Sequence, residues 1–157
     1  MLISKLWKHL PLGILFMALP PQKFREIVFQ ILFSRDFALD EPQEMIALLM
    51  NELKVTKKTM LEAYSRADLV IGRLLEIDEK IAAFSTEYAF ERISKVEKTL
   101  LRLGVFEILF DPSIPPKVAL AEAIRICRKF GSPESSQFVN GLLDSVYHAS
   151  IPEGALA

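Results

Sequence analysis

A chain of 157 residues with 51% apolar side chains has the size and composition of one compact domain with a sizeable core. Acidic and basic residues balance to a net charge of −1, which excludes a global basic field, so any RNA site has to be a local patch. The single cysteine, Cys127, excludes an intrachain disulfide and argues against a thiolate metal cluster, which fits a reducing cytoplasm.

The first twenty residues have the charge order of a secretory signal, because basic residues precede the apolar run LPLGILFMALPP. This run is too short to span a bilayer, and two prolines follow it without a small-x-small cleavage site. We therefore favour a functional start at Met17 over export and interpret residues 1–16 as an N-terminal extension or an overcalled start. The predicted domain covers residues 17–150, and residues 151–157 are a tail.

The remaining chain repeats apolar residues at spacings of three and four, the period of an α-helix, and no run alternates with the period of two expected of a strand. Gly72 predicts a kink or loosening in the longest helix, and the prolines of residues 111–116 predict a connector. The predicted helices cover residues 23–37, 41–53, 56–84, 88–110 and 116–130, and a last helix begins after Ser132. The second half of the 88–110 helix is almost wholly apolar and should be surrounded by other helices. The predicted fold class is all-α, with about seven helices.

Residues suited to catalysis or metal binding are scarce. The two histidines, His9 and His148, lie in the extension and near the tail, so neither a His–Cys dyad nor a zinc site is expected. Gly131 and Gly141 stand ten residues apart and predict a helix cap and a close-packing position instead of a phosphate loop. We expect no enzymatic activity, no metal and no cofactor.

The segment KFGSPESSQFVNGLLD, residues 129–144, closes one helix and opens the next. Gly131 stands where a left-handed helix C-cap is needed. Ser132 can accept a hydrogen bond from the free amides of the next helix, and Pro133 fits its first position. Phe138 begins the apolar stripe of that helix, whose members are Phe138, Val139, Leu142, Leu143 and Val146.

Four cations share one face of the 116–130 helix: Lys117, Arg125, Arg128 and Lys129. A solvated surface with cations near the negative end of the helix dipole is the simpler interpretation. The end of this helix adjoins the predicted turn at Gly131 and Ser132, and this neighbourhood favours RNA binding. Cations bind phosphates, and an aromatic ring, such as that of Phe130, stacks on an unpaired base. Core packing remains the alternative for both Phe130 and Phe138.

Three runs together carry a family resemblance: VEKTLLRLGVFEIL, IPPKVALAEAIRI and KFGSPESSQFVNGLLD. They closely resemble the NusB family of bacterial transcription antitermination and ribosomal-RNA processing factors. The resemblance implies two packed helical bundles, with the first three helices against the others. It also implies binding of boxA, a short single-stranded element of the ribosomal-RNA leader, together with NusE, a small-subunit ribosomal protein, within the antitermination complex on RNA polymerase.

The resemblance also implies site residues. For RNA they are Lys23, Arg25, Lys129, Phe130, Glu134, Gln137 and Phe138, and for NusE they are Phe33, Glu91 and Glu97. Many relatives have an arginine-rich tract before the first helix and a basic residue in place of Gln137, so weaker intrinsic RNA affinity is expected here. A solvated helix face and a core aromatic are the alternatives for the NusE residues. A basic ribosomal partner would supply cations that this near-neutral chain lacks.

Other functions stay open from the sequence. One is an RNA-binding module like the NusB-like domain of ribosomal-RNA cytosine methyltransferases, although this chain contains no methyltransferase domain or nucleotide-binding glycine loop. Another is a helical protein–protein scaffold without an RNA role. Some NusB proteins self-associate, so a homodimer is an open alternative to a monomer.

Overall fold

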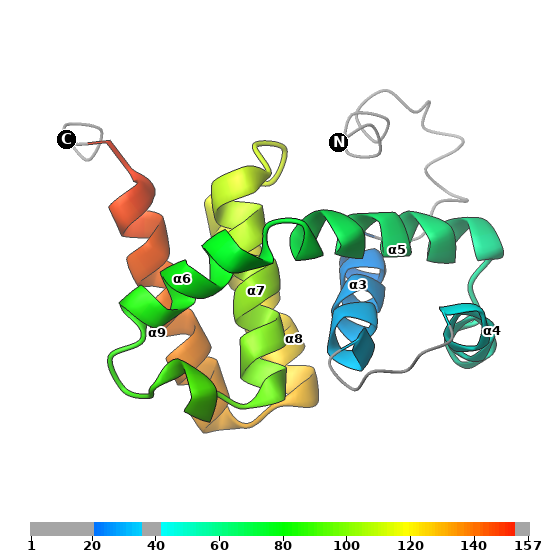
Figure 1. The fold of residues 1–157 in the computed structure, drawn as a ribbon, viewed down its shortest axis with the longest axis horizontal. Coiled ribbons are helices and arrows are strands. Elements are labelled where there is room, and N and C mark those ends of the chain that lie inside the picture. The colour runs from blue at the N-terminus through cyan, green and yellow to red at the C-terminus, as the bar shows by residue number, and fades with distance from the viewer. Residues whose placement is uncertain (1–20, 36–41, 153–157) are drawn as a thin grey trace. The chain divides into compact units, whose positions relative to one another are not determined.

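The computed structural model describes residues 21–35 and 42–152 and divides the chain into two compact units, which meet between Leu69 and Val70 (Figure 1). Over these residues the chain forms seven α-helices, labelled α3 to α9, and one short 3₁₀ helix, with no strand. The all-α prediction is confirmed. Two units are found, as two bundles were predicted, but the boundary falls inside the predicted third helix (56–84), whose second half belongs to the C-terminal unit. The proposed extension, residues 1–16, lies outside the described residues.

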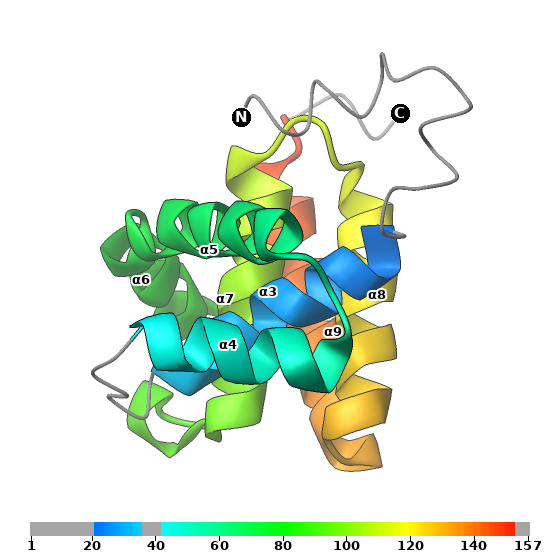
Figure 2. The same ribbon diagram turned by 90° about the vertical axis from the view of Figure 1, so that its right-hand side faces the viewer.

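The N-terminal unit contains α3 (Pro21–Arg35), α4 (Pro42–Leu53) and most of α5 (Lys57–Ile71), which Figure 2 shows from the side. The predicted α3 stripe is largely buried through Ile27, Val28, Ile31 and Leu32. Arg35, at the end of α3, binds α5 by an ion pair of 2.6 Å from Nη1 to Asp68 Oδ1. Its guanidinium also lies 5.3 Å from the centre of the Tyr64 ring. The predicted ends of the first two helices at residues 36–37 and 41 fall outside the described residues.

The long helix predicted over residues 56–84 is wrong, because the chain forms two helices there: α5 and α6 (Leu74–Phe84). The break falls at Gly72 and Arg73, where the sequence predicts a kink or loosening. The Arg73 amide donates to Val70 O at 3.1 Å, a tight turn that ends α5. Glycine has a low helix propensity, so little stability is lost when the helix is interrupted at Gly72. The break comes just after the boundary between the units.

The predicted helix over residues 88–110 begins too early. A 3₁₀ helix, η1 (Phe90–Arg92), comes first, and α7 runs from Lys95 to Phe110. Ser94 caps α7 by a capping box: the Glu97 amide donates to Ser94 Oγ, and the Ser94 amide donates to Glu97 Oε2 at 3.1 Å. Apart from Arg102, residues 99–107 are buried, but the last three residues of α7 are half-exposed, so its second half is only partly surrounded.

The C-terminal unit is built on three helices that contact one another: α7, α8 (Pro116–Phe130) and α9 (Pro133–Ser150). Helix α6 packs on α7 and α9, and Arg102 on α7 forms a two-pronged ion pair with Asp78 on α6, at 2.8 and 2.9 Å. The predicted bounds of α8 are confirmed, as is the buried α9 stripe from Phe138 to Val146.

The close-packing glycine of this unit is Gly104 on α7. A Cβ there would lie 2.7 Å from Leu143 Cδ1, so the missing side chain lets α7 and α9 approach. The close-packing prediction for Gly141 is wrong, because a Cβ at that position would meet nothing within 4 Å.

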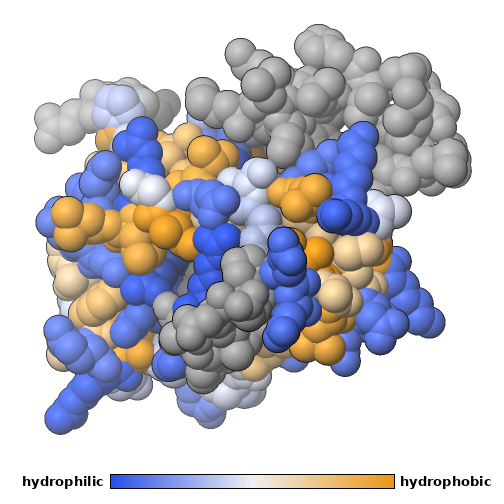
Figure 3. Space-filling model, turned by 45° about the vertical axis from the view of Figure 1, so that its right-hand side comes forward, coloured by the Kyte–Doolittle hydropathy of each residue, from blue (hydrophilic) through white to orange (hydrophobic). Residues whose placement is uncertain are grey.

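The surface is mixed in character. On the face drawn in Figure 3, hydrophobic side chains form separate patches divided by hydrophilic ones. Of the helices that the structure describes, none combines the length and the hydropathy needed to cross a membrane.

Candidate nucleic-acid interface

The end of α8, the turn at Gly131 and Ser132, and the first turns of α9 form a corner, residues 128–138, whose geometry is set by local capping. Ser132 is the N-cap of α9, and its Oγ accepts a hydrogen bond of 3.2 Å from the Ser135 amide. Pro133 is the first residue of α9. Both local predictions are confirmed, because a serine hydroxyl satisfies an orphan amide and proline needs no amide partner at a helix start.

Gly131 is not the left-handed cap that the sequence predicts. Its φ of −117° and ψ of −159° are extended, so a positive φ is not what requires glycine. The cause is a close approach: a Cβ at Gly131 would lie 3.0 Å from Cys127 O and 3.2 Å from Cys127 Sγ. The Gly131 amide already donates to the same carbonyl at 2.7 Å. The turn folds directly against the last turn of α8, which leaves almost no room for a side chain.

Cys127 lies beneath this turn and is fully buried. Burial raises the pKa of its thiol, a hydrogen bond with Ser136 lowers it, and the Glu97 carboxylate raises it further. The net shift is upward, so Cys127 stays a neutral thiol. It therefore packs the corner from inside and has none of the features of a reactive cysteine.

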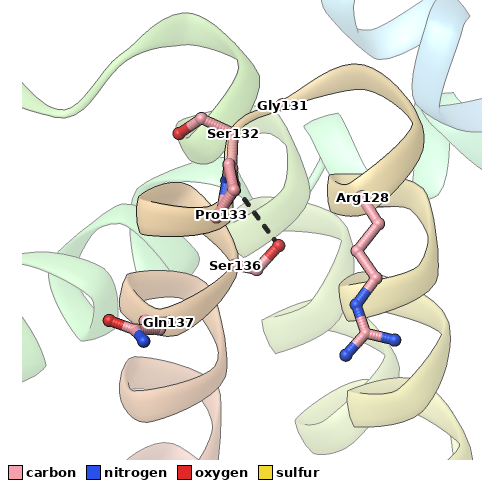
Figure 4. Close-up of a pocket in the computed structure, with 6 residues that line it drawn as sticks. All are labelled: Arg128, Gly131, Ser132, Pro133, Ser136 and Gln137. Atoms are coloured by element: carbon pink, nitrogen blue, oxygen red, sulfur yellow. Dashed lines mark hydrogen bonds between the residues drawn. The ribbon is translucent and has the colours of Figure 1, made fainter.

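A pocket of about 340 Å³ opens at the corner (Figure 4). Its wall comes from the end of α8, the turn and the first turns of α9: Arg128, Gly131, Ser132, Pro133, Ser136 and Gln137. Within it the Ser136 hydroxyl donates to Ser132 O at 3.4 Å. The wall thus combines one guanidinium with hydroxyl and amide groups, a composition suited to a phosphate and to polar base or sugar edges.

The four predicted cations of α8 differ in exposure and in position along the helix. Arg128 and Lys129 are both exposed at the corner. Arg125 is half-buried, and its Nε donates to Glu122 Oε2 at 2.7 Å. Lys117 is exposed at the opposite end of α8, roughly 18 Å from Lys129 by helical rise. The structure therefore brings two of the four cations to the corner.

The two phenylalanines of the corner differ in burial. Phe130 is 38% exposed, and the Lys129 ammonium lies 5.7 Å from the centre of its ring. Phe138 is 8% exposed and meets the Tyr88 ring edge-to-face, with centroids 5.2 Å apart. Phe130 thus presents a ring that a base can reach, whereas Phe138 belongs mainly to the core.

Comparison with known proteins agrees with this architecture. The NusB family model matches residues 22–148. The transcription antitermination protein NusB of Geobacter sp. (strain M21) is 33% identical over an alignment of 130 residues, and the match covers 78% of this chain and 90% of that protein. That of Pseudothermotoga lettingae is 33% identical over an alignment of 135 residues, and the match covers 83% of this chain and 93% of that protein.

The chain belongs to the NusB family.

Solved structures share the NusB fold of this chain. T. maritima NusB has a TM-score of 0.72 and 32% identity, and the match covers 87% of this chain and 96% of that chain. A crystal structure of antitermination factors NusB and NusE in complex with dsRNA has a TM-score of 0.69 and 26% identity, with 82% and 96% covered. The corner lies inside the matched family region.

The remaining RNA residues implied by the NusB resemblance lie on two elements. Glu134 and Gln137 are exposed on the first turns of α9, and Gln137 lines the pocket. Lys23 is exposed and Arg25 half-buried on α3, so both belong to the N-terminal unit, whereas the corner belongs to the C-terminal unit.

The residues implied for NusE have different surroundings. Glu91 is exposed on η1, and Phe33 is half-exposed on α3, with its ring stacked on Phe29 at 6.1 Å. Glu97 is half-buried, and its Oε1 accepts a hydrogen bond of 2.7 Å from Ser135 Oγ. Because Oε2 serves the α7 capping box, Glu97 ties the start of α7 to the start of α9. Glu97 therefore stabilises the packing of the two helix starts, and its contact with NusE stays a prediction.

Two features of the site are absent from the sequence predictions. The capping box had a local signal, since Ser94 and Glu97 follow the S-x-x-E pattern of a helix start. The exposed Tyr88 beside Phe138 had none, because their contact joins residues 50 positions apart (138 − 88).

Proposed function

We propose that this chain is a transcription antitermination and ribosomal-RNA processing factor that binds boxA-type single-stranded RNA together with ribosomal protein NusE. The observation that carries the proposal is the corner of a NusB-family chain: the exposed Phe130 ring stands beside the exposed Arg128 and Lys129 at the edge of a polar pocket. Its relatives include antitermination proteins, and one similar structure holds NusB, NusE and RNA.

Each group at the corner has a chemical task in this proposal. Arg128 binds a backbone phosphate by its forked donors, and Lys129 adds a second positive charge. The Phe130 ring stacks on one unpaired base. Gln137 and Glu134 face solvent on α9, where an amide donates and accepts and a carboxylate accepts from an exocyclic amine of a base.

Charge explains why a protein partner belongs to the function. The chain has a net charge of −1, and two exposed cations at the corner neutralise few phosphates. NusE, as a basic ribosomal protein, would supply further cations, and Lys23 and Arg25 of α3 are the RNA-binding residues proposed on the N-terminal unit. We infer that the complex joins RNA polymerase in the cytoplasm, and that the chain acts by assembly without catalysis.

The decisive experiment measures fluorescence anisotropy of a labelled boxA-like single strand and of a scrambled strand, each with and without NusE. The proposal predicts preference for the boxA-like strand and tighter binding with NusE. Arg128→Ala should weaken binding, whereas the matched control Lys80→Ala, which removes an exposed lysine of α6, should not. Equal binding of both strands in the presence of NusE would reject the proposal and favour a scaffold without an RNA role.

A further inference from the structure

A second exposed aromatic ring, that of Tyr88, adjoins the corner. Tyr88 lies just before η1 and is 46% exposed, although it is a large apolar ring. Its ring meets Phe138 edge-to-face, with centroids 5.2 Å apart and planes at 79°. Phe138 directly follows Gln137, which lines the corner pocket, so the Tyr88 ring contacts the residue next in sequence to the pocket wall.

The surroundings hold Tyr88 in one place. The contact with the buried Phe138 occupies one side of its ring, and its exposure leaves the rest open to solvent. Its backbone carbonyl accepts a hydrogen bond from the Ser85 hydroxyl, which anchors the loop. A ring that is already positioned loses little conformational freedom when a ligand binds, which favours its use as a platform.

A lysine lies over an aromatic ring close in sequence to Tyr88, as another lysine does at the corner. The Lys98 ammonium lies 4.4 Å from the centre of the Phe90 ring, two residues after Tyr88. At the corner the matching pair is Lys129 over Phe130, at 5.7 Å. Aromatic rings beside cations are the combination that binds single-stranded nucleic acid, because rings stack on bases and cations neutralise phosphates.

A short distance along α9 separates the corner from Phe138, the residue that the Tyr88 ring contacts. Phe138 is five residues after Pro133, roughly 8 Å along α9 by helical rise. A strand held at the corner therefore has about one and a half turns of α9 to cross before it reaches Phe138, the residue that the Tyr88 ring contacts.

We propose that Tyr88 is a second base-stacking platform of the RNA site and that Lys98, over Phe90, binds a phosphate beside it. This inference rests on the proposed RNA-binding function and extends its site from the corner onto the segment before α7. An exposed tyrosine also suits a protein partner. The polar pocket at the start of α9 and the Lys98 ammonium over Phe90 favour RNA.

The test measures binding of the boxA-like single strand, with NusE present, to the full chain and to Tyr88→Leu and Tyr88→Phe. Leucine keeps an apolar group against Phe138 but removes the stacking face, so affinity should fall about 5- to 150-fold, the range for one stacked base. Phenylalanine keeps the ring and should restore affinity to within about threefold. Leu75→Ala, which truncates a side chain 77% exposed on α6, is the matched control and should bind normally.

Salt dependence separates the two parts of the proposal. Tyr88→Leu should leave the slope of log K against log salt unchanged, because it removes no charge. Lys98→Ala should reduce the magnitude of the slope by roughly 0.7, the value for one phosphate contact on a single strand. Circular dichroism melts of every variant fix a binding temperature at which all are folded.

A measurement on the unmodified chain covers the case in which Tyr88→Leu fails to fold. The boxA-like strand carrying 5-iodouridine is photo-crosslinked to the chain, and adducts on the peptides that contain Tyr88 and Phe130 are identified by mass spectrometry. Adducts on both support the inference. Adducts at Phe130 alone overturn it.

Other outcomes separate this inference from the function on which it rests. If Arg128→Ala weakens RNA binding but Tyr88→Leu binds normally, the second platform is wrong and the proposed function stands. If Tyr88→Leu loses NusE binding while its RNA affinity alone is unchanged, the surface belongs to the protein partner and the inference is overturned. If the unmodified chain does not prefer the boxA-like strand, the proposed function fails and the inference fails with it.

Discussion

Two phenylalanines on either side of one turn show how strongly a single position decides the role of a side chain. Phe130, the last residue of α8, is 38% exposed, and Phe138, in the second turn of α9, is 8% exposed. Both follow polar residues in a similar sequence context, KF and QF. Their difference comes from the turn at Gly131, which directs the α8 end to solvent and the α9 stripe to the core.

Phe130→Ala should weaken RNA binding by about 1–3 kcal/mol and lower the free energy of unfolding by less than about 1 kcal/mol, because an exposed ring supports stacking more than folding. Phe138→Ala is the contrast: it should cost about 3–5 kcal/mol of stability, as a buried ring does. Anisotropy titrations and urea unfolding measure the two quantities. A badly destabilised Phe130→Ala that still binds RNA normally at low temperature would remove the stacking role.

Gly131→Ala should destabilise the protein by about 1–3 kcal/mol, because its Cβ would press on the Cys127 carbonyl, which cannot move without distorting α8. Gly141→Ala is the matched control on α9. It adds a methyl group in open space inside a helix and should stabilise by about 0.5–1 kcal/mol. Urea unfolding of both variants tests the pair, and an unaffected Gly131→Ala would show that the turn relaxes easily.

Among the elements, α7 and α9 are joined at their N-termini by one carboxylate. Glu97 completes the capping box of α7 and also accepts a hydrogen bond from Ser135, which stands in the first turn of α9. The first turns of α9 form part of the pocket wall, so the cap of one helix helps to position the site on another. Helix α8 contributes the cations: Arg128 and Lys129 lie at its C-terminal end, beside the pocket, and Lys117 lies at its N-terminal end.

Ser94→Ala should lower the free energy of unfolding by about 1 kcal/mol, because it leaves an amide of α7 without its cap. For a domain of this size that corresponds to a fall in Tm of about 2–4 °C. Ser145→Ala is a suitable control, since Ser145 is exposed within α9 and its hydroxyl donates to the helix's own Gly141 carbonyl. Thermal melts of both variants measure the difference in Tm, and equal Tm values for the two would count against the capping box.

The ends of α8 should differ in the salt dependence of RNA binding. Arg128→Ala and Lys129→Ala should each reduce the magnitude of the log K against log salt slope by roughly 0.7, because each removes one phosphate contact. Lys117→Ala, at the far end of α8, should leave the slope unchanged if RNA remains at the corner. A slope that changes only in Lys117→Ala would move the site to the other end of the helix.

At the scale of the whole molecule, the balance of charge governs how RNA is bound. Acidic residues number 20 and basic residues 19, so the chain offers no long-range attraction to a polyanion. Affinity must then come from a few placed groups and from a partner. The division into two units also places the α3 cations and the corner in separate parts of the chain.

NusE should therefore change the salt dependence of binding as well as the affinity. If it contributes cations of its own, the slope of log K against log salt should be steeper for the pair than for this chain alone, by roughly 0.7 for each added phosphate contact. Titrations at several salt concentrations, with and without NusE, provide the comparison. An equal slope with higher affinity would mean that NusE acts by ordering this chain instead of by touching RNA.

The sequence by itself determined the features that depend on near neighbours. Apolar periodicity predicted the all-α class and the buried α9 stripe, and the serine and proline after Gly131 predicted the start of α9, because capping acts within three or four residues. The α7 capping box was equally local and readable, although the 88–110 helix was predicted across it. The family resemblance rested on the same C-terminal runs that the structure describes as α7, α8 and α9.

Only the tertiary structure decided which groups of the site are available. Two limits on the predicted cation face are local, because Arg125 pairs with Glu122 three residues away and the length of α8 separates Lys117 from Lys129. The contacts that assemble the corner are not local. The bond from Ser135 to Glu97 spans 38 residues, and the packing of Gly104 on Leu143 spans 39 (143 − 104). Such contacts depend on how helices meet in space, which periodicity does not encode. The exposure of Phe130, the burial of Phe138 and the contact of Tyr88 with Phe138 likewise depend on how the elements pack.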